Sequence, residues 1–398
     1  MEQLPYTDST GLLAERARLV DRLADEGYLY LRNVLPAAEV ARVRHQVLAL
    51  ATDAGWLRTR TVGTSQPSGV GTPQPGRAET PQPSGAWTPQ PGGAWTPQPT
   101  GAGTPQPTGA ALPAVDAEAM ARCPEPTRQA VLKAMWRLRD LHALMHSAAL
   151  LAVVESLLGE PVFVHPRKVL RFVAPERSLV VSGLHQDHPG VQGSPRTLTA
   201  WTPLAPVTPE TGGLTIVPRS HRDGLLPLRL CAGTIVGWET DLPVDVVHSG
   251  PMDPGDVLVF TAYTVHGGSP NTGGLRLSAD CRYQPLDEPV CRDSVELDDG
   301  DWDEVYRTWP GRGRDDPLAH YWRGLPLVLA DYDPRADAAR EREAIAAGRR
   351  HDPAAASALR VTAEHSGDPA VAAEAAALLR SLPDQDHDND DPRRTSWR

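Results

Sequence analysis

Lysine and phenylalanine are scarce in this chain of 398 residues, which has two lysines (Lys133 and Lys168) and three phenylalanines. Nearly all basic side chains are arginine, and acidic residues outnumber them, so the formal net charge is -11. An acidic chain is repelled by phosphate backbones and by anionic lipid headgroups. We therefore predict that neither nucleic acid nor a membrane is a partner.

Cysteine is also scarce, and long apolar runs are absent. The four cysteines, Cys123, Cys231, Cys281 and Cys291, form no CxxC pair, which argues against a zinc knuckle, a thioredoxin motif and a disulfide scaffold. No secretory apolar region follows Met1, and no apolar run approaches the roughly 20 residues of a membrane span. We predict reduced thiols and a cytoplasmic protein; the oligomeric state is left open.

An eight-residue repeat occupies residues 64–111, in six units such as TPQPSGAW. Each unit is rich in proline and glycine and offers at most one large apolar side chain, so it has nothing to stack into a solenoid core. Proline also removes backbone donors and disfavours helix and central strand. We predict a passive, polyproline-like or disordered insertion; a partner-binding segment is the alternative.

Helical patterns flank a region that is rich in short strands. Apolar residues recur at helical spacing in 12–26, in the helix that Pro36 opens, and in 127–158, which stops at Gly159. Tyr28 to Leu35 is predicted to be a strand. After Pro161 the β-branched runs follow one another, separated by glycine and proline, in 162–173, 179–184, 197–202, 213–217, 244–248, 256–260 and 275–284.

Such spacing of short strands is typical of a β-sandwich or barrel. Helical patterns return after Tyr306, with a helical hairpin predicted in 354–382. We predict a mainly β core with flanking helices, divided into N-terminal elements (1–63), the repeat insertion (64–111), the core (112–330), a helical segment (331–382) and a disordered charged tail (383–398).

Two segments of the predicted core carry residues suited to a metal. In GLHQDHPG, His185 and Asp187 are two residues apart and therefore share one face of an extended strand. His266 comes shortly after the run DVLVF. Two imidazoles and one carboxylate leave three positions open on a metal, which is the preferred ligation of non-haem Fe(II) enzymes that activate oxygen. These three residues are the predicted metal ligands.

Oxygenases with this set of ligands commonly need 2-oxoglutarate as a cosubstrate, and a basic residue that could bind its distal carboxylate follows His266. Arg276 lies ten residues after His266, and strand alternation puts Arg276, Ser278, Asp280 and Arg282 on one face. A buried polar face of this kind is costly unless a ligand or a partner satisfies it. A guanidinium binds a carboxylate through two parallel hydrogen bonds, as the distal group of 2-oxoglutarate requires.

The chain resembles the phytanoyl-CoA dioxygenase family of iron- and 2-oxoglutarate-dependent oxygenases. The resemblance rests on DEGYLYLRNVLPAAEVARVR, the HQD segment, AWTPLAPVTPETGGLTIVPRSH, GDVLVF with its histidine, RLSADCRYQ, and DWDEVYRTWP with HYWRGLPL. It covers roughly residues 10 to 330 apart from the repeat. It implies a double-stranded β-helix (a jelly roll, cupin-like), with Fe(II) held by His185, Asp187 and His266.

The resemblance also implies that Arg276 anchors 2-oxoglutarate, with Ser278 as a second contact. The expected reaction consumes O2 and 2-oxoglutarate, oxidises a small organic molecule and releases succinate and CO2; no catalytic residue beyond the metal ligands is required. Related halogenases replace the carboxylate ligand with a small residue, so Asp187 favours hydroxylation. The segments Glu210–Gly213 and Pro218–His221 depart from the family pattern and put local loop shape and substrate contacts in question.

Other polar and aromatic residues are candidates for the pocket: Lys168, Arg171, His188, Trp201 and Arg282. Arg282 or Lys168 could assist 2-oxoglutarate, and Arg282 could instead pair with Asp280. The remaining histidines of the strand region are interpreted as core, surface or loop-bracing residues: His165, His248 and His221.

Two other classes of function are kept as alternatives. A cupin-like metalloenzyme that does not use 2-oxoglutarate would keep both histidines and the aspartate but would have no use for Arg276. A non-catalytic binding protein descended from the family would act through the repeat and the C-terminal helices. The sequence does not determine the substrate or the atom of the substrate that is oxidised.

Overall fold

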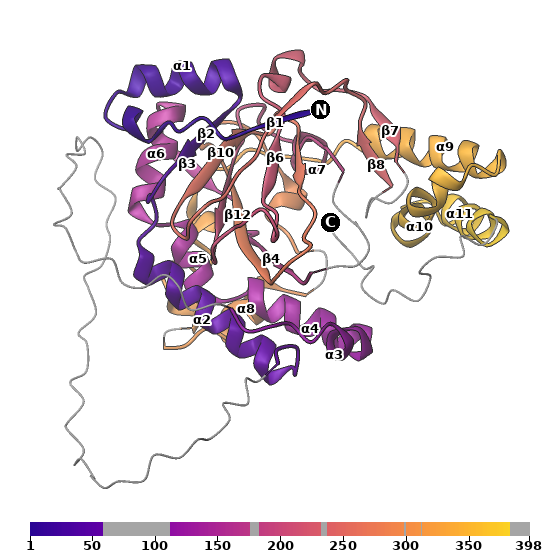
Figure 1. Ribbon diagram of the computed structural model, residues 1–398, viewed down its shortest axis with the longest axis horizontal. Coiled ribbons are helices and arrows are strands. Elements are labelled where there is room, and N and C mark those ends of the chain that lie inside the picture. Colours follow the sequence, from indigo (N-terminus) through magenta and orange to yellow (C-terminus); the bar gives the residue numbers. More distant parts are fainter. Residues whose placement is uncertain (59–111, 176–182, 232–236, 298–299, 312, 383–398) are drawn as a thin grey trace, which may run out of the picture. The chain divides into compact units, whose positions relative to one another are not determined.

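The computed structural model describes residues 1–58, 112–175, 183–231, 237–297, 300–311 and 313–382. The predicted repeat insertion, the charged tail and most of the predicted strand 179–184 lie outside these residues. The described part of the chain forms one compact unit. Figure 1 shows its strands in the middle of that unit, with most of the N-terminal helices along one side.

An antiparallel six-stranded sheet is the larger of the two sheets that build the core. Its order is β2-β10-β5-β12-β3, and β4 pairs with the first half of β12. Strand β12 is central, since β5 lies along one edge and β3 and β4 along the other. Its strands are β2 (Tyr28–Leu31), β3 (Val162–Val164), β4 (Val169–Val173), β5 (Leu198–Pro203), β10 (Val257–Thr261) and β12 (Arg276–Pro285).

A four-stranded sheet of order β1-β9-β6-β11 faces the first. Its strands are β1 (Glu2–Leu4), β6 (Leu214–Ile216), β9 (Val246–His248) and β11 (His266–Gly268). A cluster of buried apolar residues joins the two sheets and includes Tyr28 and Trp201 from the larger sheet and Ile216 from the smaller one. The prediction of a jelly-roll core with flanking helices is confirmed.

Strand alternation separates the two faces of the larger sheet. On β12, Leu277, Ala279, Cys281 and Tyr283 belong to the main hydrophobic cluster beneath the helices. The even-numbered residues of β12 therefore face the space between the sheets. This is the face on which the sequence placed Arg276, Ser278, Asp280 and Arg282.

Helices from both sides of the repeat cover the outer face of the larger sheet and supply the rest of that cluster. They are α1 (Arg16–Glu26), α2 (Ala37–Asp53), α3 (Ala117–Arg122), α4 (Glu125–Trp136), α5 (Arg139–Met145) and α6 (Ala148–Leu158). Gly159 ends α6 in a left-handed conformation (φ 80°), as the sequence predicted.

The prediction of one helical stretch over 127–158 is wrong in detail, because the chain turns twice within it. Leu138 and Ser147 adopt extended ψ angles of 127° and 131°, and each precedes the start of a new helix. Apolar residues lie on several sides of this stretch, so three short helices bury more of them against the sheet than one straight helix would. The spacing of apolar residues predicts helix in this stretch, but it does not predict where one helix ends and the next begins.

Short elements complete the jelly roll and the segment after it. Buried aromatic residues, among them Trp302, Tyr306 and Trp322, pack on Phe163 of β3. The elements are the strands β13 (Val290–Cys291) and β14 (Leu329–Ala330), the helices α7 (His188–Val191) and α8 (Trp302–Arg307), and the 3-10 turns η1 (Thr10–Leu12), η2 (Ser220–Asp223), η3 (Arg292–Ser294), η4 (Gly313–Asp315), η5 (Tyr321–Gly324) and η6 (Pro353–Ala355).

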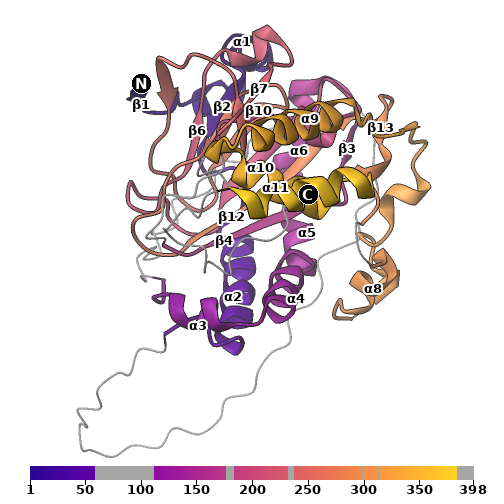
Figure 2. The same cartoon turned by 90° about the vertical axis from the view of Figure 1, so that its right-hand side faces the viewer.

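Three C-terminal helices pack together, as Figure 2 shows, and Figure 1 shows a β-hairpin beside them. They are α9 (Arg335–Arg349), α10 (Ala356–His365) and α11 (Pro369–Ser381), and the hairpin is β7 (Leu228–Leu230) with β8 (Trp238–Thr240). Trp238 is buried among alanine and leucine side chains of these helices. The backbone N–H of Thr240 donates to the carbonyl of Leu184, so the same hairpin also contacts the segment that leads to His185.

Replacing Gly237 with alanine is expected to separate the hairpin from α10. Gly237 has a φ of 77°, and a Cβ there would lie 2.2 Å from the backbone nitrogen of Ala358. Strain and overlap together should lower the free energy of unfolding by about 2 to 4 kcal/mol. Denaturant unfolding and the rate of proteolysis of α9–α11 measure the effect.

Gly55 is the matched control for this prediction. Its φ is 73°, but a Cβ there would meet nothing within 4 Å. Gly55→Ala should therefore cost only the backbone strain, about 1 kcal/mol. Equal losses in the two variants would show that the contact with α10 does not hold the hairpin in place.

Two expectations from composition concern cysteines and membranes. The four cysteines are all free of disulfides. Among the described helices, none by itself is long and apolar enough to cross a membrane, although α5 and α6 together pass that test by length and composition across a bend of 40°. Both helices contribute to the main hydrophobic cluster beneath the sheet.

Candidate metal centre

The two predicted histidine ligands are joined by their own backbones. His185 and His266 form an antiparallel bridge in which each N–H donates to the other's carbonyl, at 2.8 and 2.9 Å. His266 begins β11 and pairs with Ile216 on its other side, so the bridge extends the smaller sheet by one residue pair. The two rings then lie 4.3 Å apart between their centroids.

Asp187 lies close to both rings, so the three predicted ligands come together. Its Oδ1 is 3.8 Å from Nε2 of His266. One ligand atom from each of the three residues can be chosen such that all lie within 4.8 Å of one another. This separation suits a single ion, because ligand atoms that each lie about 2.1 Å from a metal are about 3 to 4 Å apart.

Both imidazoles are oriented by hydrogen bonds of their other ring nitrogen. Nδ1 of His185 is 2.8 Å from the carbonyl of Gly183, and Nδ1 of His266 is 3.0 Å from the carbonyl of Thr264. A carbonyl only accepts, so each Nδ1 carries the proton and each Nε2 presents its lone pair. Metal-binding histidines are fixed in this way by their outer partners.

The charges of the site favour a deprotonated ligand set. Burial lowers the pKa of His185, and it lowers the pKa of His266 to about 4, so both rings are neutral at neutral pH. Burial by itself would raise the pKa of Asp187, but the Arg282 guanidinium, the two imidazoles and the Thr199 hydroxyl together hold it well below its usual range. A neutral imidazole and an ionised carboxylate are the forms that bind a metal.

The predicted cosubstrate residues lie on the same interior face of the larger sheet. Ser278 is fully buried, and its Oγ has no hydrogen-bond partner among the described residues. Arg276 is partly buried and donates from Nη1 to the carbonyl of Ser269 at 3.0 Å. Ser269 is three residues beyond His266, so this contact lies about 10 Å from the histidine by strand rise.

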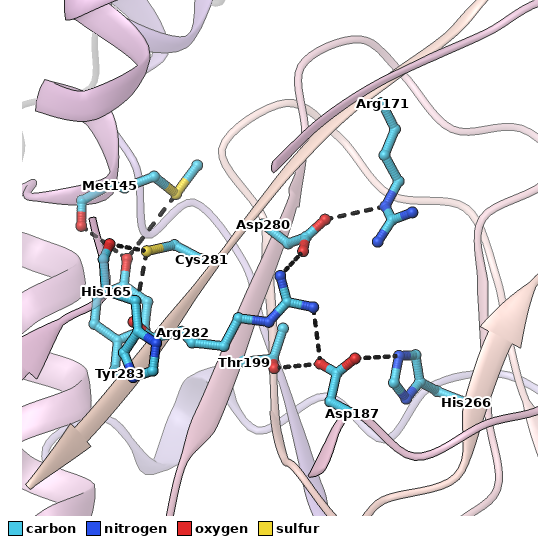
Figure 3. A network of polar contacts seen from close by, with 10 residues as sticks. All are labelled: Met145, His165, Arg171, Asp187, Thr199, His266, Asp280, Cys281, Arg282 and Tyr283. Atoms are coloured by element: carbon cyan, nitrogen blue, oxygen red, sulfur yellow. Dashed lines mark hydrogen bonds and ion pairs between the residues drawn. The ribbon is translucent and has the colours of Figure 1, made fainter. Parts of the chain in front are cut away.

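Three of the pocket candidates face the space between the sheets. Arg282 donates from Nη2 to Oδ2 of Asp187 at 3.1 Å and from Nη1 to Oδ2 of Asp280 at 2.6 Å (Figure 3). Arg171 donates from Nε to the other oxygen of Asp280 at 3.0 Å. Trp201 is buried beside these residues, in register with Asp280 on the neighbouring strand.

His188 lies at the start of α7, directly after Asp187. Its ring stacks on Tyr263 with centroids 4.5 Å apart, and burial lowers its pKa. His221 contacts the carbonyl of Ala24 at the end of α1, and His165 bonds Gln284 in the core. His188 thus lies beside the metal ligands. The contacts of His221 fit a residue that braces a loop, and those of His165 fit a core histidine.

The placement of Lys168 in the pocket is wrong. Its Nζ donates to the carbonyl of His165 and lies 5.9 Å from the ring centroid of Tyr321, on the face that Cys281 occupies. Lys168 lies just before β4, outside the sheet, whereas Arg171 lies within β4 and pairs with Ser278 on the interior face. Lys168 is therefore buried beneath the helices, away from the metal ligands.

Three contacts of the site were missing from the sequence interpretation. Thr199 donates to Oδ2 of Asp187 at 2.7 Å, and it faces Arg282 across the β5–β12 pairing. The two carbonyls that orient the imidazoles were also not foreseen. The pairing of β5 with β12 carries this information, and no local pattern in the sequence shows which strands become neighbours.

A jelly roll with two imidazoles and one carboxylate on its interior defines a class, the non-haem metal-dependent oxygenases. The sequence profile described as phytanoyl-CoA dioxygenase matches residues 23–276, well over half of the chain. The chain belongs to the phytanoyl-CoA dioxygenase family.

Curated relatives share part of the chain. A 1-deoxypentalenic acid 11-beta-hydroxylase of Streptomyces arenae is 35% identical over 152 residues, 34% of this chain and 53% of the relative. A methylphosphonate hydroxylase of Gimesia maris is 32% identical over 151 residues, 36% of this chain and 53% of the relative. The chain thus spans about half the length of the curated relatives it matches.

Solved structures are more distant. The epimerase SnoN in complex with Fe3+, alpha-ketoglutarate and nogalamycin RO is 19% identical, with a TM-score of 0.43 and coverage of 72% of this chain and 93% of that one. EctD from S. alaskensis with 2-oxoglutarate and 5-hydroxyectoine is 18% identical, with a TM-score of 0.39 and coverage of 80% and 88%.

Proposed function

We propose that this protein is an Fe(II)- and 2-oxoglutarate-dependent dioxygenase that hydroxylates a small organic molecule. The observation that carries the proposal is the convergence of His185, Asp187 and His266, whose ligand atoms lie within 4.8 Å of one another. The buried hydroxyl of Ser278, to which no described residue bonds, supports a bound cosubstrate on the same face.

The side chains of the site have separate roles in this proposal. His185, Asp187 and His266 would hold Fe(II), which with 2-oxoglutarate and O2 supplies the oxidation and yields succinate and CO2. Arg276 binds the distal carboxylate of 2-oxoglutarate, and Ser278 donates a hydrogen bond to it. The apolar side chains between the sheets, such as Trp201 and Phe260, exclude water from the reacting groups.

Anaerobic titration of the purified protein with Fe(II), with and without 2-oxoglutarate, tests the proposal. We expect a visible absorption band only when both are present, and succinate formation when oxygen is admitted. A cupin-like enzyme would bind the metal but form neither the band nor succinate. A non-catalytic descendant would not bind Fe(II) at this site at all.

Replacing Arg276 with methionine is expected to raise the 2-oxoglutarate concentration needed for half-maximal succinate formation by about 10- to 100-fold. A charge-assisted hydrogen bond contributes about 1.5–3 kcal/mol, and each 1.4 kcal/mol is tenfold. The affinity for Fe(II) alone should stay unchanged and is the internal control. An unchanged 2-oxoglutarate dependence would contradict the role given to Arg276.

The substrate in this proposal is a small acid. Two relatives carry names that specify a carboxylic acid and a phosphonate as substrates. Arg171 supports this class, because its side chain is about one third exposed and its guanidinium points toward the metal ligands in Figure 3. Its positive charge contributes to the lowered pKa of His185, which places it within electrostatic reach of the ligands.

Paired acids and neutral methyl esters test the substrate class. In a panel of small carboxylic and phosphonic acids, acids should stimulate 2-oxoglutarate consumption more than their esters do. Arg171→Gln should remove this preference while leaving substrate-free consumption of 2-oxoglutarate measurable. Equal stimulation by acids and esters in the unmodified protein would exclude an anionic group as the recognised feature.

A further inference from the structure

The two oxygens of the Asp187 carboxylate have different surroundings. Oδ2 accepts hydrogen bonds from Oγ1 of Thr199 at 2.7 Å and from Nη2 of Arg282 at 3.1 Å. Oδ1 is turned toward Nε2 of His266 (Figure 3). One oxygen is therefore occupied by two donors of the protein, and the other faces the place where the ligand atoms meet.

We propose that Arg282 is a positioning residue that makes Asp187 bind the metal through Oδ1 alone; the proposal rests on the proposed function, because it takes Asp187 as a metal ligand. A free carboxylate can also bind through both oxygens. Oδ2 is prevented from doing so by the two hydrogen bonds it already accepts. Three positions then stay open for cosubstrate and oxygen, as this class of chemistry requires.

The register of the larger sheet builds this clamp from adjacent strands. Thr199 and Arg282 are directly opposed in the β5–β12 pairing, so their Cβ atoms are about 5 Å apart on the interior face. Both side chains reach the same carboxylate oxygen. Two donors fixed on one rigid sheet form a small anion-binding cradle, and Asp187 places its carboxylate in that cradle.

Asp280 holds Arg282 in the orientation that the clamp needs. It lies two residues earlier on β12 and therefore on the same face. Its Oδ2 accepts from Arg282 at 2.6 Å, and its Oδ1 accepts from Arg171 at 3.0 Å. Charges alternate along the chain of contacts from Arg171 through Asp280 and Arg282 to Asp187, and each buried charge has an opposite neighbour.

A positioning role and a purely structural role predict different losses. Loss of any buried arginine destabilises the fold, because it leaves its acidic partner without compensation. Loss of an outer partner of a metal ligand additionally lowers metal affinity by about 10- to 100-fold. Metal affinity and the geometry of the bound metal are therefore the informative quantities.

Cobalt(II) is the probe for the first experiment, because its absorption spectrum reports the number and arrangement of its ligands. The full-length, metal-free protein is titrated with Co(II) in the absence of 2-oxoglutarate and substrate. Arg282→Met and Thr199→Val should weaken binding, Arg282→Met by about 10- to 100-fold, and should change the spectrum of the bound ion.

Matched controls distinguish these effects from general destabilisation. Arg128→Met removes another buried arginine, on α4, and Thr202→Val removes another buried hydroxyl of β5, one that bonds the carbonyl of Asp256. Both control variants should melt at a lower temperature yet keep the Co(II) affinity and spectrum of the unmodified protein.

A rescue experiment tests the cradle directly. Asp187→Gly should lose Co(II) affinity, and added formate should restore part of it by occupying the position of the carboxylate between Arg282 and Thr199. Formate should have no effect on the double variant Asp187→Gly/Arg282→Met.

The proposal is overturned if folded Arg282→Met binds Co(II) with unchanged affinity and spectrum, or if formate rescues the double variant equally. These results differ from a failure of the proposed function. In that case the unmodified protein itself would not bind Co(II) at this site, or would bind it and form no succinate with Fe(II), 2-oxoglutarate and oxygen.

Discussion

Replacing His266 with alanine is expected to lower Fe(II) affinity by more than about a hundredfold and to leave no measurable 2-oxoglutarate-dependent formation of succinate. An outer partner of a metal ligand is already worth about 10- to 100-fold in affinity, and His266 supplies a ligand atom itself. Its ring also packs on Phe260, with centroids 4.5 Å apart, so its loss opens the interior at the metal position. Anaerobic titration and a succinate assay measure the two effects.

His248 is the matched control for His266. Both residues pair with Ile216, one from each side, in the smaller sheet. His248 accepts or donates a hydrogen bond at the Tyr28 hydroxyl, 2.6 Å away, and lies outside the ligand group. His248→Ala should reduce stability and leave Fe(II) affinity unchanged. If both variants lost Fe(II) affinity equally, the loss would be caused by disruption of the smaller sheet and not by removal of the His266 ligand atom.

Acid is expected to destabilise the metal-free protein well before its carboxylates are protonated. Burial, together with the positive charge of Lys168, lowers the pKa of His142 and lowers those of His146 and His165 to about 3. Unfolded histidine has a pKa near 6.5. Between about pH 6.5 and 4 the unfolded chain therefore takes up protons that the folded chain does not.

The free energy of unfolding must then fall as the pH decreases through this window. Each of these three histidines contributes a slope of up to about 1.4 kcal/mol per pH unit, so together they approach about 4 kcal/mol per pH unit. In the metal-free protein His185 and His266, whose pKa values are also lowered, add to this slope. Stability should be highest above about pH 6.5 and should be largely lost near pH 4.5, given typical stabilities of about 5–15 kcal/mol. Guanidinium unfolding at a series of pH values measures the slope.

His142→Leu provides the comparison variant for the acid effect. His142 is fully buried against Trp302 and Trp309, and leucine replaces it with an apolar side chain that takes up no proton. The slope of the free energy of unfolding against pH should therefore decrease by up to about 1.4 kcal/mol per pH unit, which corresponds to one proton per molecule. A stability that stays constant between about pH 7 and 5 would mean that these histidines are not held neutral in the folded protein.

Period-two alternation predicted the functional face of β12 correctly. Ser278, Asp280 and Arg282 could be assigned to one side because the strand is long, regular and uninterrupted. The order of the motifs likewise sufficed to bring three ligands into one proposal. These are local features, and local features are what a single sequence contains. The prediction that His185 and Asp187 share an extended strand is wrong, because Asp187 has helical backbone angles (φ -72°, ψ -30°) at the start of α7.

The errors arose where strands or helices break. The run 162–173 was interpreted as one strand, but the chain leaves the sheet between Val164 and Val169, and Lys168 lies in that break. Thr199 could not be found, because its role depends on β5 lying beside β12. Register between distant strands is set by the packing of the whole core and not by residues near in sequence.

The central position of β12 has a practical consequence for anyone who expresses a shortened form of this protein. The family-matched region ends at residue 276, at the first residue of β12. Termination there would remove the strand that joins β5 to β3 and β4, together with Ser278, Asp280 and Arg282. The truncated product should be recovered as aggregate. The exposed edge of β5 would form backbone hydrogen bonds with other molecules, and the apolar side chains beneath it would be exposed to solvent.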